Sequence, residues 1–175
     1  MRPDTAKEKK LIDNLHSKDQ AIVLETINIL RHEGKVNYIP FIIELLKNTS
    51  AGEIRNSLIA FLNDLKYQGA VSELVNAVQN DKYKSERGII LSACWQSGLD
   101  FSMYLEIFIM LCITENCQNA IEAFSVVEHS ISQSTKKEIT DYIIQIKSHL
   151  NRVNREKKLM LVEMINMMEE VNEVV

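Results

Sequence analysis

The sequence predicts an all-helical fold, a right-handed α–α superhelix of about five helical pairs. An internal repeat with a period of 32 residues extends without gaps from Ile22 to Tyr142, and its apolar positions recur at the i, i+3 spacing of one helical face. Five glycines and two prolines in 175 residues leave few of the tight turns that a sheet protein needs. One repeat domain is therefore predicted over residues 1–175.

The predicted core consists of apolar columns, each occupied once per repeat. In the second helix of each pair the columns are Ile27, Ile59, Leu91, Ala123 and, three residues later, Leu30, Leu62, Cys94, Val126. In the first helix of the following pair they are Ile43, Val75, Ile107, Ile139 and Leu46, Val78, Met110, Tyr142. Each repeat is therefore a pair of amphipathic helices that share one apolar interior.

Capping signals divide the chain into individual helices. Capping boxes are predicted at Ser17-x-x-Gln20, Ser50-x-x-Glu53 and Thr135-x-x-Glu138, and helix ends at Gly34, Gly69 and Gly98. The first helices are predicted over residues 7–16, 37–48, 70–80, 101–114 and 134–150. The second helices are predicted over residues 18–33, 51–66, 84–97, 117–130 and 153–172.

The last helix differs in composition from every other segment because it is rich in methionine. Met160, Met164, Met167 and Met168 lie on one arc, and acidic residues occupy the opposite side. Residues 153–175 are predicted to cap the fold, since a terminal repeat must cover the last open core. The alternative is an adaptable surface including Met164 and Met168 that docks a partner helix or forms a homodimer.

The stretch from Glu53 to Asp81 resembles a HEAT-like repeat of the short bacterial kind. Arg55 and Leu62 match the family's Arg early in the second helix and its Leu seven residues later, and Arg87 with Cys94 repeats the match. The resemblance covers about residues 50–110 and is degenerate elsewhere. It implies that Arg55 and Arg87 are structural and join a ladder of polar bonds between repeats.

Charge and compartment signals favour a cytoplasmic protein that binds neither nucleic acid nor membrane. The formal net charge is −4, and residues 101–133 contain four acidic residues and no Lys or Arg. The charged N-terminus indicates no signal peptide, and the longest apolar stretch, 107–113, is too short to span a bilayer. Three cysteines without close pairing suit free thiols in a reducing compartment.

Sequence motifs point to no catalytic chemistry, metal or cofactor. The chain lacks a nucleophile elbow, a phosphate loop and the metal-binding helix motif H-E-x-x-H. Cys112 and Cys117 lack the spacing of a zinc knuckle. The predicted function is therefore a non-enzymatic scaffold or regulator. The alternative is a nucleic-acid-binding protein or an enzyme similar to the HEAT-like DNA glycosylases, which the acidic charge disfavours.

The predicted partner is a protein or peptide segment bound on the concave face formed by the second helices. The column His32, Asp64, Gln96, Glu128 is polar throughout, whereas Glu25, Ser57, Ile89, Ile121 and Asn28, Ala60, Ser92, Phe124 become apolar along the chain. Ile89, Trp95, Ile121 and Phe124 are predicted to form one apolar patch there. Internal packing of these four residues is the alternative.

Overall fold

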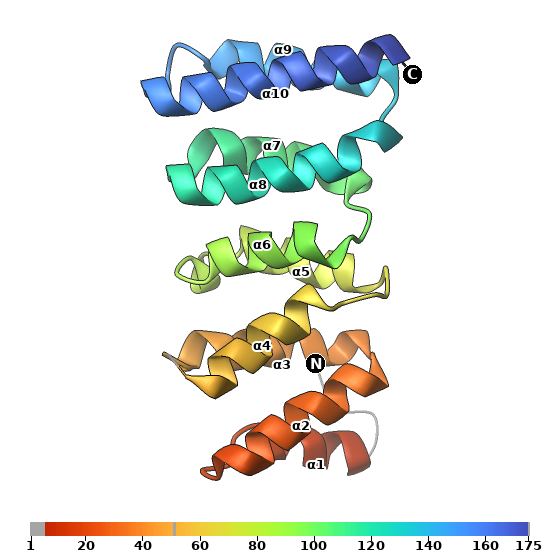
Figure 1. The fold of residues 1–175 in the computed structure, drawn as a ribbon, viewed down its shortest axis with the longest axis vertical. Coiled ribbons are helices and arrows are strands. Elements are labelled where there is room, and N and C mark those ends of the chain that lie inside the picture. The colour runs from red at the N-terminus through yellow and green to blue at the C-terminus, as the bar shows by residue number, and fades with distance from the viewer. Residues whose placement is uncertain (1–5, 51, 175) are drawn as a thin grey trace. The chain divides into compact units, whose positions relative to one another are not determined.

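The computed structural model describes residues 6–50 and 52–174, and this part of the chain is all-helical, with no strand (Figure 1). The α-helices in these ranges are α1 (Ala6–Asn14), α2 (Gln20–Glu33), α3 (Ile39–Asn48), α4 (Glu53–Asn63), α5 (Ala70–Gln79), α6 (Arg87–Ser97), α7 (Leu105–Thr114), α8 (Cys117–Ser130), α9 (Lys136–His149) and α10 (Arg155–Val174). Short 3-10 turns are η1 (Val36–Tyr38), η2 (Asp81–Tyr83), η3 (Ser102–Tyr104) and η4 (Ile131–Gln133). Each helix predicted from the repeat is present, which confirms the all-α class.

The chain divides into two compact units between Leu99 and Asp100. Unit 1 contains α1 to α6, and unit 2 contains α7 to α10. The single domain predicted over residues 1–175 therefore stays a prediction.

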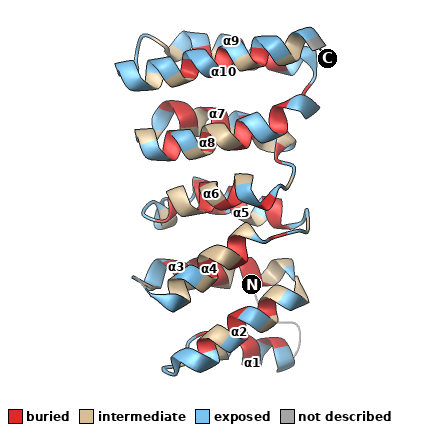
Figure 2. Cartoon of the chain, in the orientation of Figure 1, coloured by how far each residue is buried: buried red, intermediate tan, exposed pale blue. Residues whose placement is uncertain are grey.

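Unit 1 is built from three helical pairs: α1 with α2, α3 with α4, and α5 with α6. Helix α4 packs on both α2 and α6, and α3 packs on α5, so successive pairs contact each other through equivalent helices. Leu30, Leu62 and Cys94, which form one predicted core column, have no exposed surface. Ile59 is an exception in its column because it is only half-buried. Figure 2 shows the buried positions running along one side of each of these helices.

Unit 2 contains two helical pairs, α7 with α8 and α9 with α10. Helix α10 also contacts α7 and α8, so its inner face closes over the pair before it. The rings of Phe101 and Phe108 meet edge-on at 5.4 Å in this core. Leu161 and Met164 of α10 are fully buried as well.

The helix starts agree with the predicted capping boxes at one position of three. Thr135 and Glu138 form the predicted box at the start of α9. The prediction at Ser17 is wrong, because the Asp19 carboxylate accepts from the Ala21 amide at 2.9 Å and begins α2. A carboxylate next to the first turn is a stronger acceptor than a distant hydroxyl. The prediction at Ser50 is also wrong, because α4 begins after Gly52 without a side-chain cap.

Two of the three predicted glycine stops are confirmed. Gly34 and Gly98 follow α2 and α6 in the left-handed region, with φ of 60° and 69°. Gly69 instead precedes α5 with an ordinary φ of −60°. A Cβ atom there would lie 2.9 Å from Cγ2 of Val36, so close packing is what favours glycine at this position.

In the described ranges, helices that combine the length and the apolar character needed to cross a membrane do not occur.

Candidate functional site

An open hollow of about 270 Å³ lies between the N-terminal turns of α8 and α10 in unit 2. Its lining consists of Cys117 and Ile121 from α8 and Glu156, Lys157 and Met160 from α10. We call it the α8/α10 hollow. Residues four apart lie on the same face of a helix, so Cys117 with Ile121 and Glu156 with Met160 each line the hollow as a pair, and Lys157 adds to the α10 side.

Asparagine N-caps fix where α8 and α10, the two helices that line the hollow, begin. The Asn116 side chain accepts from the amide of Asn119 at 3.0 Å, so Cys117 is the first residue of α8. The Asn154 side chain accepts from the amide of Lys157 at 2.9 Å at the start of α10. Both bonds satisfy amides that a first helical turn leaves free. The hollow is therefore formed from ordered turns and not from a loop.

The Lys157 ammonium group of the lining is held by a partner within the chain, so its alkyl portion forms part of the wall. Nζ of Lys157 donates to the carbonyl oxygen of Ile113 at 2.7 Å, and this bond joins α10 to the end of α7. The Cys117 thiol lies 3.6 Å from Oε2 of Glu156. Ile121 is 56% exposed, so a large aliphatic side chain faces solvent at the mouth. The α8/α10 hollow is thus suited to an apolar group.

Cys117 is the one partly accessible thiol, since all three cysteines lie in the described ranges. Cys94 and Cys112 are buried, and loss of hydration raises the pKa of both thiols well above the usual range. The Cys112 Sγ also contacts the carbonyl oxygen of Ala120 at 3.5 Å. These two cysteines are core residues, whereas Cys117 can report on the α8/α10 hollow.

The four residues of the predicted apolar patch lie in two different units. Ile89 and Trp95 belong to α6 of unit 1, and both are half-buried. Trp95 also interacts with another residue of the chain. Ile121 and Phe124 belong to α8 of unit 2, and only Ile121 is exposed. A single patch containing all four therefore stays a prediction.

Met164 and Met168 lie on the inner face of α10 and have no exposed surface. They pack into the core of unit 2 together with Leu161 and Ile165. Side chains without accessible surface cannot form a docking surface, so neither methionine belongs to the candidate site. Their burial favours the capping interpretation of residues 153–175.

The repeated arginines fasten the two helices of their own pair. Arg55 donates to the carbonyl oxygens of Leu46 at 2.8 Å and Thr49 at 2.6 Å, where α3 ends. Arg87 is buried and pairs with Asp81 at 3.0 Å, between α5 and α6. At the next equivalent position the Asn119 side chain donates to Glu115 at 3.0 Å, between α7 and α8.

These contacts are structural, and each lies within one helical pair. The resemblance had implied bonds between repeats for this column. Bonds between neighbouring pairs of unit 1 occur instead at Arg31–Asp64 and Asn63–Gln96.

The chain matches no family model and no curated protein. Its membership of the HEAT-like repeats therefore stays a prediction.

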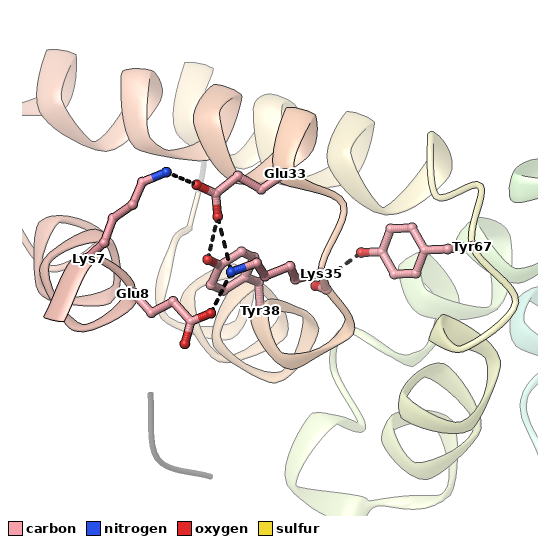
Figure 3. A network of polar contacts seen from close by, with 6 residues as sticks. All are labelled: Lys7, Glu8, Glu33, Lys35, Tyr38 and Tyr67. Atoms are coloured by element: carbon pink, nitrogen blue, oxygen red, sulfur yellow. Dashed lines mark hydrogen bonds and ion pairs between the residues drawn. The ribbon is translucent and has the colours of Figure 1, made fainter. Parts of the chain in front are cut away.

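A network of charged side chains joins α1 to the junction of α2 and α3 in unit 1 (Figure 3). Lys35 pairs with the buried Glu8 at 2.6 Å, and Lys7 pairs with Glu33 at 2.5 Å. The Tyr38 hydroxyl donates to Glu33 at 2.6 Å. The network holds the first helical pair against the second.

The network shifts the titration of its members in the directions expected for paired groups. The hydrogen bond from Lys7 lowers the pKa of Glu33, and the bond to Glu8 raises the pKa of Lys35. Burial, with the bond to Glu33, raises the pKa of Tyr38 to about 12. Each of these side chains is paired with another member of the network. The network is therefore better explained as a structural contact between helices than as a catalytic site.

Clusters of three or more His, Cys, Asp or Glu side chains able to hold a metal ion do not occur in the described ranges.

Sequence reasoning identified Ile121 but missed the other residues of the α8/α10 hollow. Cys117 was judged only as a metal ligand, and Met160 was placed in the methionine arc. The gap-free repeat ends at Tyr142, so the sequence did not define how α10 is positioned against α8. The available signal was the position of Cys117 in the first turn of the helix predicted over residues 117–130.

Proposed function

We propose that the chain is a non-enzymatic binding module for a protein segment and that the α8/α10 hollow is its main contact site. The observation that carries the proposal is the exposed side chain of Ile121 at the mouth of an apolar hollow formed from ordered helical turns. Exposed apolar surface of this kind marks contact sites in proteins. An anchor residue inserted into such a hollow is typical of protein interfaces.

The size of the hollow favours a side-chain anchor over a free small molecule. Ligand pockets in enzymes typically enclose about 300–1,000 Å³ and surround most of the ligand. The α8/α10 hollow measures about 270 Å³ and is open. Its lysine donates to the Ile113 carbonyl oxygen and is therefore not free to orient a polar substrate. One large apolar side chain of a partner fits these features.

We also propose that the helical pairs continue as one HEAT-like solenoid, with the second helices on its concave face and the protein in the cytoplasm. Support comes from the gap-free repeat, which runs through both units, and from the stacking of equivalent helices within each unit. The polar column predicted for the concave face also supports the proposal, because its members are all exposed: His32, Asp64, Gln96 and Glu128.

The nucleic-acid alternative has weaker support. Phosphate binding requires several Lys or Arg side chains on one face. The segment that carries α7 and α8, residues 101–133, contains four acidic residues and no Lys or Arg. A partner held at the α8/α10 hollow by an apolar anchor agrees better with this composition.

Affinity capture with matched variants tests the proposal. We would compare the wild-type chain with Ile121→Asp and with Ile144→Asp, which changes the same residue type at 61% exposure on α9. We expect a partner that the wild type and Ile144→Asp retain and Ile121→Asp loses. Equal melting temperatures of the two variants would control for folding. Equal retention of that partner by all three proteins would refute the proposal.

A further inference from the structure

The outer face of α10 is opposite to the face that enters the core of unit 2. Its exposed residues are Arg155, Lys158, Leu159, Val162, Glu163, Asn166, Glu169, Glu170 and Glu173. The buried residues Leu161, Met164, Ile165 and Met168 occupy the other side. We call the exposed set the α10 outer face.

Two aliphatic side chains lie in the first half of the α10 outer face. Leu159 is 65% exposed and Val162 is 38% exposed. They are one turn apart, so they project from the same part of the helix. A helix that only caps a repeat array would carry polar residues at these positions.

The charges of the α10 outer face are segregated on either side of Leu159 and Val162. Arg155 and Lys158 precede them, whereas Glu163, Glu170 and Glu173 follow them. Basic residues in a first turn and acidic residues in a last turn oppose the helix dipole, each at a cost of about 0.3–1 kcal/mol. Glu156 in the first turn has the favourable sign, but helix stability alone does not explain the positions of Arg155, Lys158, Glu170 and Glu173.

We propose that the α10 outer face pairs with the same face of a second copy of the chain, with the two helices antiparallel. Antiparallel pairing about a two-fold axis places the basic end of each helix against the acidic end of the other. The two aliphatic side chains of each copy then lie on either side of the two-fold axis, with the two Val162 side chains nearest to it. Parallel pairing would place like charges side by side, which is unfavourable.

The helical period supports this pairing. Arg155 and Glu173 are separated by 18 residues, which is five full turns of an α-helix, so both project in the same direction. Neither side chain has an ion-pair partner in the described part of the chain. In the antiparallel pair, Arg155 of one copy therefore faces Glu173 of the other copy, and the contact occurs twice.

The paired surface is small, which determines how the dimer behaves. Stable interfaces bury about 1,200–2,000 Å² in total, whereas one helical face with two aliphatic side chains provides less. The dimer is accordingly weak, with a dissociation constant on the order of micromolar or above. Because ion pairs contribute to it, added salt lowers the affinity.

Sedimentation velocity of the full chain over a range of concentrations tests the pairing. We expect the mass to rise from 20.1 kDa to twice this value with concentration. Leu159→Glu with Val162→Glu should remain monomeric, and both positions are exposed enough for the fold to persist. A wild-type chain that stays monomeric at every concentration would overturn the proposal.

Charge reversal tests the antiparallel orientation. Arg155→Glu with Lys158→Glu makes the α10 outer face uniformly acidic and should abolish the dimer. Adding Glu170→Lys and Glu173→Lys to these changes exchanges the two ends and should restore it. Glu169 is left unchanged because it pairs with Lys147 at 3.0 Å within the chain. Failure of the four-residue exchange to restore the dimer would overturn the orientation.

The site of the dimer contact is separable from the α8/α10 hollow. Ile121→Asp alters the α8/α10 hollow and leaves the α10 outer face intact, so the dimer should persist in this variant. Loss of the dimer in Ile121→Asp would place the contact at the hollow and would contradict the inference.

Discussion

The Asn63 side-chain amide donates a 2.9 Å hydrogen bond to the side-chain oxygen of Gln96, which lies 33 residues later. Arg31 lies 3.5 Å from Asp64, also 33 residues later. The two contacts are related by one 32-residue repeat, since Asn63 is equivalent to Arg31 and Gln96 to Asp64. Unit 1 therefore reproduces the sequence repeat as a repeated contact between neighbouring helical pairs.

The core of this repeat should be far more sensitive to substitution than its polar contacts. We expect Leu62→Ala to lower the free energy of unfolding by about 2–5 kcal/mol, because Leu62 is fully buried and leaves a cavity. Asn63→Ala should cost about 1 kcal/mol or less, since its hydrogen bond is exposed. Urea unfolding measures both. Similar small effects from the two variants would show that the core columns are misassigned.

Arg55 should contribute to stability through the end of α3. Arg55→Ala removes two bonds to carbonyl oxygens at the end of α3, those of Leu46 and Thr49, of which the Leu46 oxygen also accepts the Thr49 amide. Hydrogen bonds to a charged group contribute about 1.5–3 kcal/mol, so we expect a loss near the lower end of this range. Arg55→Lys keeps the charge and should recover part of it in the same unfolding assay. A neutral Arg55→Ala would contradict the role that we assign.

Stability should fall at alkaline pH because of two tyrosines in unit 1. Burial raises the pKa of Tyr38 and that of Tyr67 to about 12, above the ordinary value of 10.0. The folded state therefore favours the protonated phenols, and their contribution is intact below pH 10 and lost as the pH rises toward about 12. Unfolding experiments over this range measure the slope. The slope should be smaller in Tyr38→Phe, and an unchanged slope would exclude Tyr38 as a cause.

Local rules predicted the helices well because the repeat supplies the same information several times. The capping box at Thr135 and Glu138 could be predicted from the sequence because its two residues lie within one helical turn of each other. The start of α2 was misplaced because Asp19 competes with Ser17 for the same role, and only the structure shows which one caps.

The candidate site was harder to predict because it depends on contacts between distant residues. Ile121 was identified from its column, but its neighbours Glu156 and Met160 come from a helix that lies outside the gap-free repeat. Met164 and Ile165 are adjacent to Glu163, and sequence spacing alone did not distinguish a core face from a docking face. Packing of α10 against α8 decided between them.

Thiol labelling should distinguish the three cysteines of the folded chain. We expect a maleimide to modify Cys117 quickly, because it is partly accessible, and to leave Cys94 and Cys112 unmodified. Burial raises the pKa of the latter two thiols, and the thiolate is the reactive form. Mass spectrometry should therefore find one label on the native chain and three after denaturation. Rapid labelling of Cys94 or Cys112 in the native chain would contradict the core assignment.

The central claim is that a partner segment occupies the α8/α10 hollow, and Cys117 in its lining measures this occupancy directly. The decisive measurement is the rate of Cys117 labelling in the presence and absence of a saturating amount of the captured partner, with the Ile121→Asp variant as the control. We expect the partner to slow labelling of the wild type by about tenfold or more, equivalent to about 1.4 kcal/mol of protection, and to leave the variant unaffected. An unchanged labelling rate in the wild-type complex would contradict the claim.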